Sequence, residues 1–227
     1  MDFYGSDLGN RLINDALFPE EIKEFLKLEK ELLSEIIPLF DSLVEVGCMQ
    51  GRYLQWATKH VQNYIGIDIV SSYIEEGCRN LTQNYGKLIK GHFILGDAEK
   101  IDTILNWEKF SINPNRTILL FPFNSFGNMQ NYLAVIKSLK KSGASFIIST
   151  YSTSEIATSI RYKYYEACKY SNLKKEKTNE GVVFSSKDGL WTIAYHQNFL
   201  LRIFKEEKLK VDVVNFAGIG KAYIAIK

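Results

Sequence analysis

The chain has 227 residues, of which 46% are hydrophobic and 24% charged, and this composition excludes an intrinsically disordered protein. Its formal net charge of +2 gives no overall attraction to nucleic acid or to a membrane surface. No apolar run reaches the roughly 18 residues of a membrane span, and no signal segment is visible. The three cysteines show no metal-ligand spacing, so we expect no metal site and a cytoplasmic, reducing setting.

The first part of the chain, residues 1–40, is expected to form a helical cap. Pro19 followed by two glutamates is typical of a helix start, and the leucines and isoleucines beyond it give the helix one apolar side. Pro38 is expected to end this helix. The aromatic stretch around Tyr4 is either a mobile lid or a packed terminus, and we favour the packed terminus.

Residues 41–152 alternate between strand and helix patterns. Short apolar runs predict strands at 43–46, 64–68, 93–97, 117–122 and 145–151. Amphipathic patterns predict helices at 52–60, 71–81, 98–107 and 129–141. Alternation of this kind favours a mostly parallel sheet with helices on both faces.

The last third of the chain departs from this alternation. A helix is predicted at 153–170, and two strand patterns within 182–195 flank an Asp-Gly turn, which indicates a β-hairpin. The remaining patterns predict a helix and two strands that close the sheet, at 197–207, 210–216 and 221–226. We therefore expect one domain, 1–227, in which residues 153–197 are an insertion and residues 198–227 complete the sheet.

Glycine or polar residues directly follow four predicted strands: Gly47, Asp68, Asp97 and Asn124. Because the carboxyl ends of parallel strands meet at one edge of a sheet, we expect these residues to lie together at a ligand site. Glycine at position 47 lets the backbone approach a ligand closely, and the helix after it presents its free N–H groups there.

The two aspartates are suited to a nucleoside. Asp68 stands about 20 positions after Gly47, where a carboxylate accepts hydrogen bonds from ribose hydroxyls. Asp97 is placed to accept from an adenine amino group, with Ala98 donating its backbone N–H. The alternative is that each aspartate caps the helix that follows it, which begins near Ser71 for Asp68 and at Ala98 for Asp97. Capping a helix and binding a nucleoside are compatible roles.

The pattern Glu45-x-Gly47-x-x-x-Gly51 resembles the first motif of the class I S-adenosylmethionine-dependent methyltransferases. Asp68 and Gly96-Asp97-Ala98 match the acids of the second and third strands of that family, and the resemblance covers roughly residues 40–150. It implies a Rossmann-like three-layer α/β sandwich with a mostly parallel seven-stranded sheet whose last strand is antiparallel. Met49 replaces the middle glycine of the motif, so its side chain either narrows the cleft or turns aside if φ allows.

The resemblance also implies S-adenosyl-L-methionine as cofactor, bound by the core at 41–152. Gly47 and its neighbours would hold the methionine moiety, Asp68 the ribose, and Asp97 with Ala98 the adenine. The complete set of expected cofactor-binding residues is Tyr4, Glu45, Gly47, Cys48, Met49, Gly51, Asp68, Ile69, Asp97, Ala98, Phe121 and Asn124.

A sulfonium makes methyl transfer favourable by itself, so the protein must mainly align the reactants and exclude water. The candidates for a catalytic role are Asn124, Ser125, Tyr151 and His196. For the first two the alternative is stabilisation of a turn, and for His196 an ordinary surface or core position. Arg161 and its neighbouring tyrosines could hold an anionic or aromatic acceptor, but an exposed helix face is the better account of them.

The predicted function is methyl transfer to a nitrogen or oxygen of a small-molecule acceptor by in-line displacement, with the acceptor recognised by residues 153–197. Deleting residues 182–195 should then spare cofactor binding and abolish turnover. The lysines within 163–177 are diluted by glutamates and are read as a solvated helix face, so neither nucleic acid nor a membrane is expected as a partner. Alternatives are a protein- or RNA-directed methyltransferase, another transfer that uses the same cofactor, or a non-catalytic partner subunit, which Met49 alone favours. A dehydrogenase is disfavoured by the glycine spacing.

Overall fold

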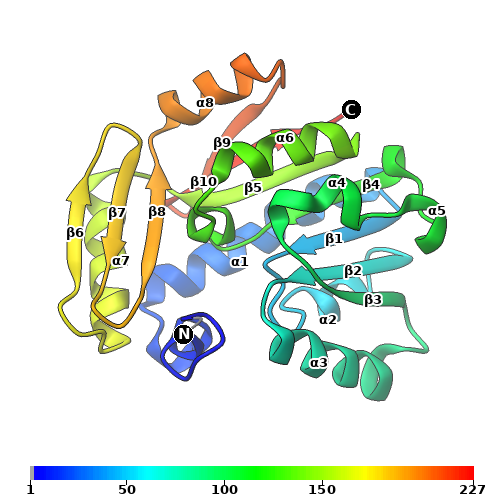
Figure 1. The fold of residues 1–227 in the computed structure, drawn as a ribbon, viewed down its shortest axis with the longest axis horizontal. Coiled ribbons are helices and arrows are strands. Elements are labelled where there is room, and N and C mark those ends of the chain that lie inside the picture. Colours follow the sequence, from blue (N-terminus) through cyan, green and yellow to red (C-terminus); the bar gives the residue numbers. More distant parts are fainter. Residues whose placement is uncertain (1–2) are drawn as a thin grey trace.

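A computed structural model describes residues 3–227, and within them the chain forms two sheets (Figure 1). The strands of the larger sheet are β1 (Ser42–Val46), β2 (Asn63–Asp68), β3 (Lys90–Leu95), β4 (Thr117–Phe121), β5 (Ser145–Tyr151), β9 (Asp212–Phe216) and β10 (Gly220–Ala225). Their order is β3-β2-β1-β4-β5-β10-β9, and only β10 runs antiparallel to its neighbours. The predicted fold class is confirmed, with the last strand of the chain lying between β5 and β9.

The helices are α1 (Glu20–Ile36), α2 (Leu54–Ala57), α3 (Ser71–Asn80), α4 (Ile101–Ile104), α5 (Trp107–Phe110), α6 (Tyr132–Ser142), α7 (Glu155–Ala167) and α8 (Gln197–Glu206). Short 3-10 turns occupy Gly9–Ile13, Asp15–Leu17, Ile37–Leu39, Ala98–Lys100, Pro114–Arg116 and Ser125–Asn128, and a π-helical turn occupies Leu81–Tyr85. Pro19 precedes α1, as predicted, and Pro38 lies in the turn that follows that helix.

Capping residues explain where the helices depart from the predicted bounds. Asn131 caps α6 by accepting from the backbone N–H of Ala134, so this helix begins three residues later than the apolar pattern indicates. The single helix predicted at 98–107 is instead three short pieces, because the side chain of Asn106 caps α5 and the chain is extended at Leu105. The first helix after the glycine turn is also short, and α2 covers only part of 52–60.

The sheet is covered on both faces, as its apolar strands require. Alternate residues of β1 belong to different core clusters: Leu43 packs with α1 and α2, whereas Val44 and Val46 pack with α4, α6 and α8. Figure 1 shows α4 and α6 in front of the sheet and α1 passing behind it. This burial on both faces fixes the register that brings the strand ends together.

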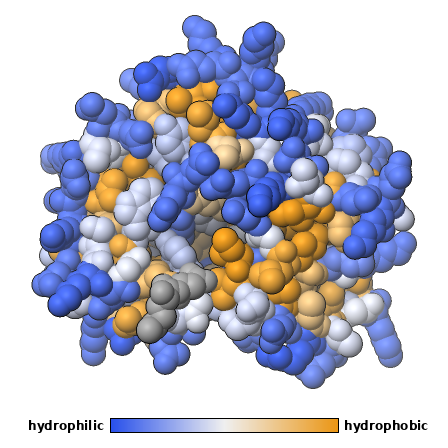
Figure 2. Space-filling view, viewed as in Figure 1, coloured by the Kyte–Doolittle hydropathy of each residue, from blue (hydrophilic) through white to orange (hydrophobic). Residues whose placement is uncertain are grey.

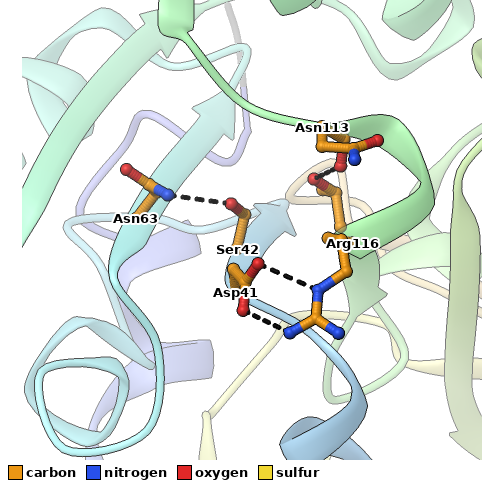
Figure 3. A network of polar contacts seen from close by, with 6 residues as sticks. Asp41, Ser42, Asn63, Asn113 and Arg116 are labelled. Atoms are coloured by element: carbon orange, nitrogen blue, oxygen red, sulfur yellow. Dashed lines mark hydrogen bonds and ion pairs between the residues drawn. The ribbon is translucent and has the colours of Figure 1, made fainter.

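Polar contacts join neighbouring strands at the edge where β1, β2 and β4 begin (Figure 3). The guanidinium of Arg116 donates to both carboxylate oxygens of Asp41, at 2.9 and 2.6 Å. Asn63 Nδ2 donates to Ser42 Oγ at 3.0 Å, which links the first residues of β2 and β1. This network lies at the N-terminal ends of the strands, away from the residues predicted to bind ligand.

The insertion between β5 and α8 contains α7 and a second sheet of β6 (Lys174–Lys177), β7 (Gly181–Ser185) and β8 (Trp191–Tyr195). The hairpin of β7 and β8 is confirmed. The interpretation of the lysines as a helix face is wrong for 174–177, because they form the exposed edge strand β6, where lysines discourage pairing with another chain. The hairpin also reaches the main core through Ile193 and Tyr195, so its deletion would remove core residues and does not isolate acceptor binding.

The N-terminal segment packs against the insertion rather than standing away from it. Phe3 is buried, and the hydroxyls of Tyr164 and Tyr170 donate to the carbonyls of Leu12 and Leu8, at 2.6 and 2.9 Å. These contacts favour the packed terminus over the mobile lid.

None of the helices within residues 3–227 has both the length and the hydrophobicity needed to cross a bilayer.

Candidate functional site

A cavity of about 560 Å³ opens at the C-terminal ends of the central strands, within the range of small-molecule sites. Gly47, Asp68, Asp97 and Asn124 all line it, so the structure brings together the four strand ends that the sequence singled out. The N-terminal segment and the insertion complete its wall. Figure 2 shows this face hollowed near its centre, with hydrophobic residues gathered beside the hollow.

The turn after β1 gives the cavity its closest backbone approach. Gly47 has φ +75°, and a Cβ built on it would lie 2.8 Å from Ser125 Cβ, so neither the conformation nor the space suits a side chain. Met49 also has positive φ, at +51°, and lines the cavity. Met49 therefore adopts a left-handed backbone conformation that a glycine would adopt more easily.

Asp68 connects two of the converging segments. Its Oδ2 accepts from the backbone N–H of Met49 at 2.8 Å, and its Oδ1 accepts from Val70 N–H at 3.0 Å. Val70 is the N-cap residue of α3, so Ser71 does not cap this helix and Asp68 satisfies its first free N–H instead. Because each carboxylate oxygen can accept a second hydrogen bond, capping is compatible with binding ribose hydroxyls.

The next acid along the edge is Asp97. It caps the 3-10 turn Ala98–Lys100, with Oδ1 accepting from Glu99 N–H at 2.9 Å. Both Asp97 and Ala98 line the cavity, and so does the exposed side chain of Ile69 beside them. The predicted capping role is confirmed, and contact with adenine stays a prediction.

Four residues of the expected cofactor-binding set do not line the cavity. Glu45 is fully buried behind the turn, where its Oε2 accepts from Tyr53 N–H and from Tyr64 Oη–H. Cys48 and Phe121 are also fully buried. A side chain at Gly51 would meet the ring of Phe93 at 2.9 Å, so this glycine serves packing. These four residues lie behind the cavity wall in this structure, and their contact with the cofactor stays a prediction.

The burial of Glu45 has an electrostatic consequence. Desolvation raises the pKa of its carboxyl from 4.5 to about 8, although the hydrogen bonds from Tyr64 and Tyr53 act in the opposite direction. Burial likewise raises the pKa of Glu29, whose oxygens accept from Tyr53 Oη–H and Phe123 N–H. Burial therefore raises the pKa of both carboxyls behind the glycine turn.

Asn124 is a structural junction rather than a free catalytic group. Its Nδ2 donates to Thr192 Oγ1 and to the carbonyl of Ile193, at 3.1 and 3.2 Å, and its Oδ1 accepts from Thr150 Oγ1–H. Both amide hydrogens are thus engaged, and the residue adopts left-handed φ at +60°. Stabilisation of the turn, the alternative raised for this residue, is the role that the geometry gives it.

The other catalytic candidates differ in position. Ser125 lines the cavity and donates to the carbonyl of Val46 at 3.0 Å. Tyr151 also lines it, and its hydroxyl has no hydrogen-bond partner within residues 3–227. His196 is not part of the wall: it precedes α8, and its Nδ1 lies 2.9 Å from Thr153 Oγ1. The structure therefore does not bring His196 together with the other candidates, and a catalytic role for it stays a prediction.

Part of the cavity wall consists of residues that no sequence pattern indicates. Tyr4 lines the cavity, as expected, and its hydroxyl donates to the carbonyl of Trp191 at 2.8 Å. Wall residues that were not singled out as part of the site include Arg52, Phe123, Tyr164, Trp191 and Thr192. No local pattern marks them, because their meeting depends on the packing of the N-terminal segment and the insertion.

Arg161 was expected on an exposed helix face, and this is wrong. It is fully buried, and its Cζ lies 4.8 Å from the centre of the Phe184 ring and 5.1 Å from that of Tyr151.

No group of three or more His, Cys, Asp or Glu side chains suited to a metal ion occurs in the part of the chain that the structure describes.

The sheet order and a cavity bounded by glycine and acids at the strand ends define a Rossmann-like protein with a nucleotide-type site. The chain belongs to the methyltransferase domain family, which matches residues 41–211. The fold is similar to that of an S-adenosylmethionine-dependent methyltransferase from Aquifex aeolicus, with 15% identity over 98% of this chain and 100% of the other, and a TM-score of 0.62. No functionally curated protein matches the sequence.

Two further solved structures contain S-adenosylhomocysteine. The magnesium protoporphyrin IX methyltransferase from Synechocystis PCC 6803 has 12% identity over 100% of this chain and 97% of its own, with a TM-score of 0.63. The 1,6-didemethyltoxoflavin-N1-methyltransferase from Burkholderia thailandensis has 10% identity over 89% and 79%, with a TM-score of 0.59. These likenesses agree with the family motif, whose cofactor is S-adenosyl-L-methionine.

The residues on this cavity fit that cofactor. The site of Gly47 leaves no room for a Cβ, as a close backbone approach requires, and Asp68 and Asp97 offer carboxylate oxygens to hydroxyl and amino groups. Arg52, which lines the cavity beside the glycine turn, offers a cation to a carboxylate.

Proposed function

We propose that this protein transfers the methyl group of S-adenosylmethionine to a nitrogen or oxygen of a small molecule bound in the same cavity. The observation that carries the proposal is the composition of the cavity wall. Acids and glycine from the strand ends form one part, and aromatic side chains from the N-terminal segment and the insertion form the other. A polar region suited to a nucleoside thus adjoins an apolar region suited to an organic acceptor.

In the polar region we assign the ribose to Asp68, the adenine to Asp97 and Ala98, and the methionine moiety to the turn at Gly47 and Met49. Arg52 is added to this set as the partner of the methionine carboxylate. Its Cζ lies 5.0 Å from the centre of the Phe123 ring, so the guanidinium has a defined place at the wall.

In the apolar region the acceptor would be held by residues 153–197, which contribute Tyr164, Tyr165 and Trp191 to the wall. The bound cofactor supplies an activated methyl group. The protein's part is then to orient the acceptor atom toward it and to keep water away, and aromatic walls serve both purposes. A nitrogen or oxygen that is already nucleophilic needs no general base.

A small acceptor is favoured by the way the cavity is enclosed. The hydrogen bond from Tyr4 to the carbonyl of Trp191 joins the N-terminal segment to the insertion across the wall. A wall built from two such segments suits a small molecule better than a folded protein or a duplex. Two of the similar structures carry names that describe methylation of small molecules, a tetrapyrrole and a toxoflavin precursor, which agrees with this choice.

Calorimetric titration tests the proposal. S-adenosylmethionine and S-adenosylhomocysteine should bind with micromolar dissociation constants, and NAD should not bind. Incubation with labelled S-adenosylmethionine and a cell-extract fraction below 1 kDa should then give a labelled product. Binding of NAD in place of S-adenosylmethionine, or labelling confined to protein or RNA in an unfractionated extract, would contradict the proposal.

A further inference from the structure

The N-terminal segment, residues 3–13, lies between the insertion and α3 (Figure 1). It forms part of the cavity wall without belonging to either sheet, and the side chains and backbone that it contributes are those of Phe3, Tyr4, Gly9, Leu12 and Ile13. The way in which the segment is attached to each neighbour determines along which border the cavity can open.

Apolar packing joins the segment to the insertion. The two share one hydrophobic cluster with the start of α1, and its members include Phe3, Leu8, Leu12, Tyr164 and Phe184. Within residues 3–227 this cluster contains no residue of α3. Because the burial of apolar surface is the main source of stability, the segment and the insertion form one packed unit to which α3 does not belong.

Hydrogen bonds hold the same border along much of its length. Arg11 Nη1 donates to the carbonyl of Cys168, and Tyr170 Oη donates to that of Leu8, both at 2.9 Å. The hydroxyl of Tyr4 also donates to the insertion, at 2.8 Å. Separation of the segment from the insertion would therefore break several hydrogen bonds together with the apolar cluster.

The border with α3 is held by a different kind of contact. Tyr73 is buried and lines the cavity, and its hydroxyl lies 2.9 Å from the carbonyl oxygen of Tyr4 and 2.6 Å from Asn10 Oδ1. The single hydroxyl hydrogen serves both acceptors. Because α3 begins shortly after Asp68, this border adjoins the site that we assign to the ribose.

We propose that Tyr73 is the latch of cofactor exchange. The segment stays with the insertion, and the cavity opens between the segment and α3 when the hydroxyl of Tyr73 releases Tyr4 and Asn10. Local opening follows the border with the fewest buried apolar contacts, and the apolar cluster lies on the other border. Tyr73 is a positioning residue, because it acts on the cofactor through the segment. The proposal rests on the proposed function, since the exchanged ligands are S-adenosylmethionine and its product.

A latch has a kinetic signature that differs from that of a direct contact with the ligand. If the free and the loaded protein open along the same border, a weaker latch raises the association and dissociation rates by the same factor. The dissociation constant then stays nearly unchanged. Loss of a direct contact with the cofactor raises mainly the dissociation rate, and the dissociation constant rises with it.

The experiment measures both rates on the full chain. Radiolabelled S-adenosylmethionine is bound and then displaced by an excess of unlabelled S-adenosylhomocysteine, and association is followed at increasing concentrations of the labelled compound. Tyr73→Phe should raise both rates by about threefold to tenfold, the factor that one neutral hydrogen bond provides, and should change the dissociation constant by less than about twofold.

Asn10→Ala tests the latch from the opposite side. It should raise both rates by a smaller factor than Tyr73→Phe, because the hydroxyl of Tyr73 keeps Tyr4 as an acceptor. Asn10 is exposed and does not line the cavity, so a lost contact with the cofactor cannot explain the effect. The exposed position also preserves the test if Tyr73→Phe does not fold, which circular dichroism checks.

Tyr170→Phe is the matched control. Tyr170 and Tyr73 are both buried, and each hydroxyl donates to a backbone carbonyl of the segment at 2.9 Å, one on each border. Tyr170→Phe should leave both rates within about twofold of the original values. An acceleration as large as that in Tyr73→Phe would show that the segment separates from the insertion, and it would overturn the proposal.

The remaining outcomes separate the latch from the proposed function. A rise in the dissociation rate alone in Tyr73→Phe would make this tyrosine a direct ligand contact and overturn the latch. Unchanged rates in both Tyr73→Phe and Asn10→Ala would overturn it equally, while the methyltransferase assignment stands. Failure of the unaltered protein to bind S-adenosylmethionine would overturn the proposed function, and the latch with it.

Discussion

The carboxylate of Asp68 accepts a hydrogen bond from the backbone N–H of Met49, with Oδ2 and N 2.8 Å apart. This contact ties the end of β2 to the loop after β1, and it engages the backbone of a residue that has φ +51°. A left-handed conformation is costly for a residue with a side chain, so the hydrogen bond helps to hold the loop in the shape that lines the cavity.

Replacing this carboxylate should weaken cofactor binding. Asp68→Asn keeps the size of the side chain but loses the charge and one of the two acceptors, which leaves Met49 N–H or Val70 N–H without a partner. A hydrogen bond to a charged group contributes about 1.5–3 kcal/mol, so we expect a loss of roughly tenfold or more in affinity for S-adenosylmethionine by calorimetry. Asp41→Asn, at the opposite edge of the sheet, makes the same change of charge and should leave the affinity within twofold.

The glycine turn can be tested with a pair of alanine substitutions. Gly47 and Gly143 have nearly the same φ, +75° and +78°, but only at Gly47 would the new Cβ meet another atom, Ser125 Cβ at 2.8 Å. Both Gly47→Ala and Gly143→Ala should lose about 1–2 kcal/mol of unfolding free energy to the left-handed backbone. Gly47→Ala should lose more in urea denaturation and should also bind S-adenosylmethionine more weakly. Equal behaviour of the two variants in both measurements would show that the contact with Ser125 does not matter.

The buried carboxyl of Glu45 predicts a pH dependence of stability. Its pKa is about 8 in the folded protein, against 4.5 for an ordinary glutamate, because burial disfavours the charged form. Between these two values the folded state holds more protons than the unfolded state, so the free energy of unfolding falls as pH rises. The contribution is complete below about pH 4.5 and lost by about pH 8, with a limiting slope of about 1.4 kcal/mol per pH unit.

Urea denaturation between pH 5 and 8 measures this slope. Glu45→Gln keeps an acceptor for Tyr53 N–H and Tyr64 Oη–H but cannot ionise, so it should flatten the curve. Some slope should remain, because burial also raises the pKa of Glu29. Glu35→Gln, on the exposed side of α1, is the control and should reproduce the original curve. An unchanged slope in Glu45→Gln would mean that this carboxyl is ionised in the folded protein.

We expect the substitution of Asn124 to lower the free energy of unfolding, because its side chain holds three segments together. Asn124→Ala removes the hydrogen bonds to Thr192, Ile193 and Thr150, and it places alanine at φ +60°. We expect a loss of about 2–4 kcal/mol of unfolding free energy. Asn172→Ala is the matched control, because Asn172 is exposed and has φ +51° but its side chain forms no hydrogen bond within residues 3–227. It should lose about 1 kcal/mol or less. A stable Asn124→Ala protein that lacks only turnover would instead favour a catalytic role.

Local pattern determined the main sheet and the position of the site within it. Strands such as 145–151 are recognisable because burial on both faces demands a continuous apolar run, and the structure has β5 over the same residues. Gly47, Asp68 and Asp97 could be placed together because the topology of a parallel sheet puts all its carboxyl ends at one edge. This inference needs only the order of the elements.

Tertiary structure alone decided which side chains line the cavity. Tyr4 and Trp191 are 187 positions apart and meet through one hydrogen bond, a contact that no periodicity predicts. The lysines of β6 have no apolar alternation, so their strand depends on pairing with β7. Arg161 has the charge and spacing of an exposed residue but is enclosed by rings from three separate elements. A sequence determines the period of each element, whereas the surroundings of a single side chain depend on which distant segments pack against it.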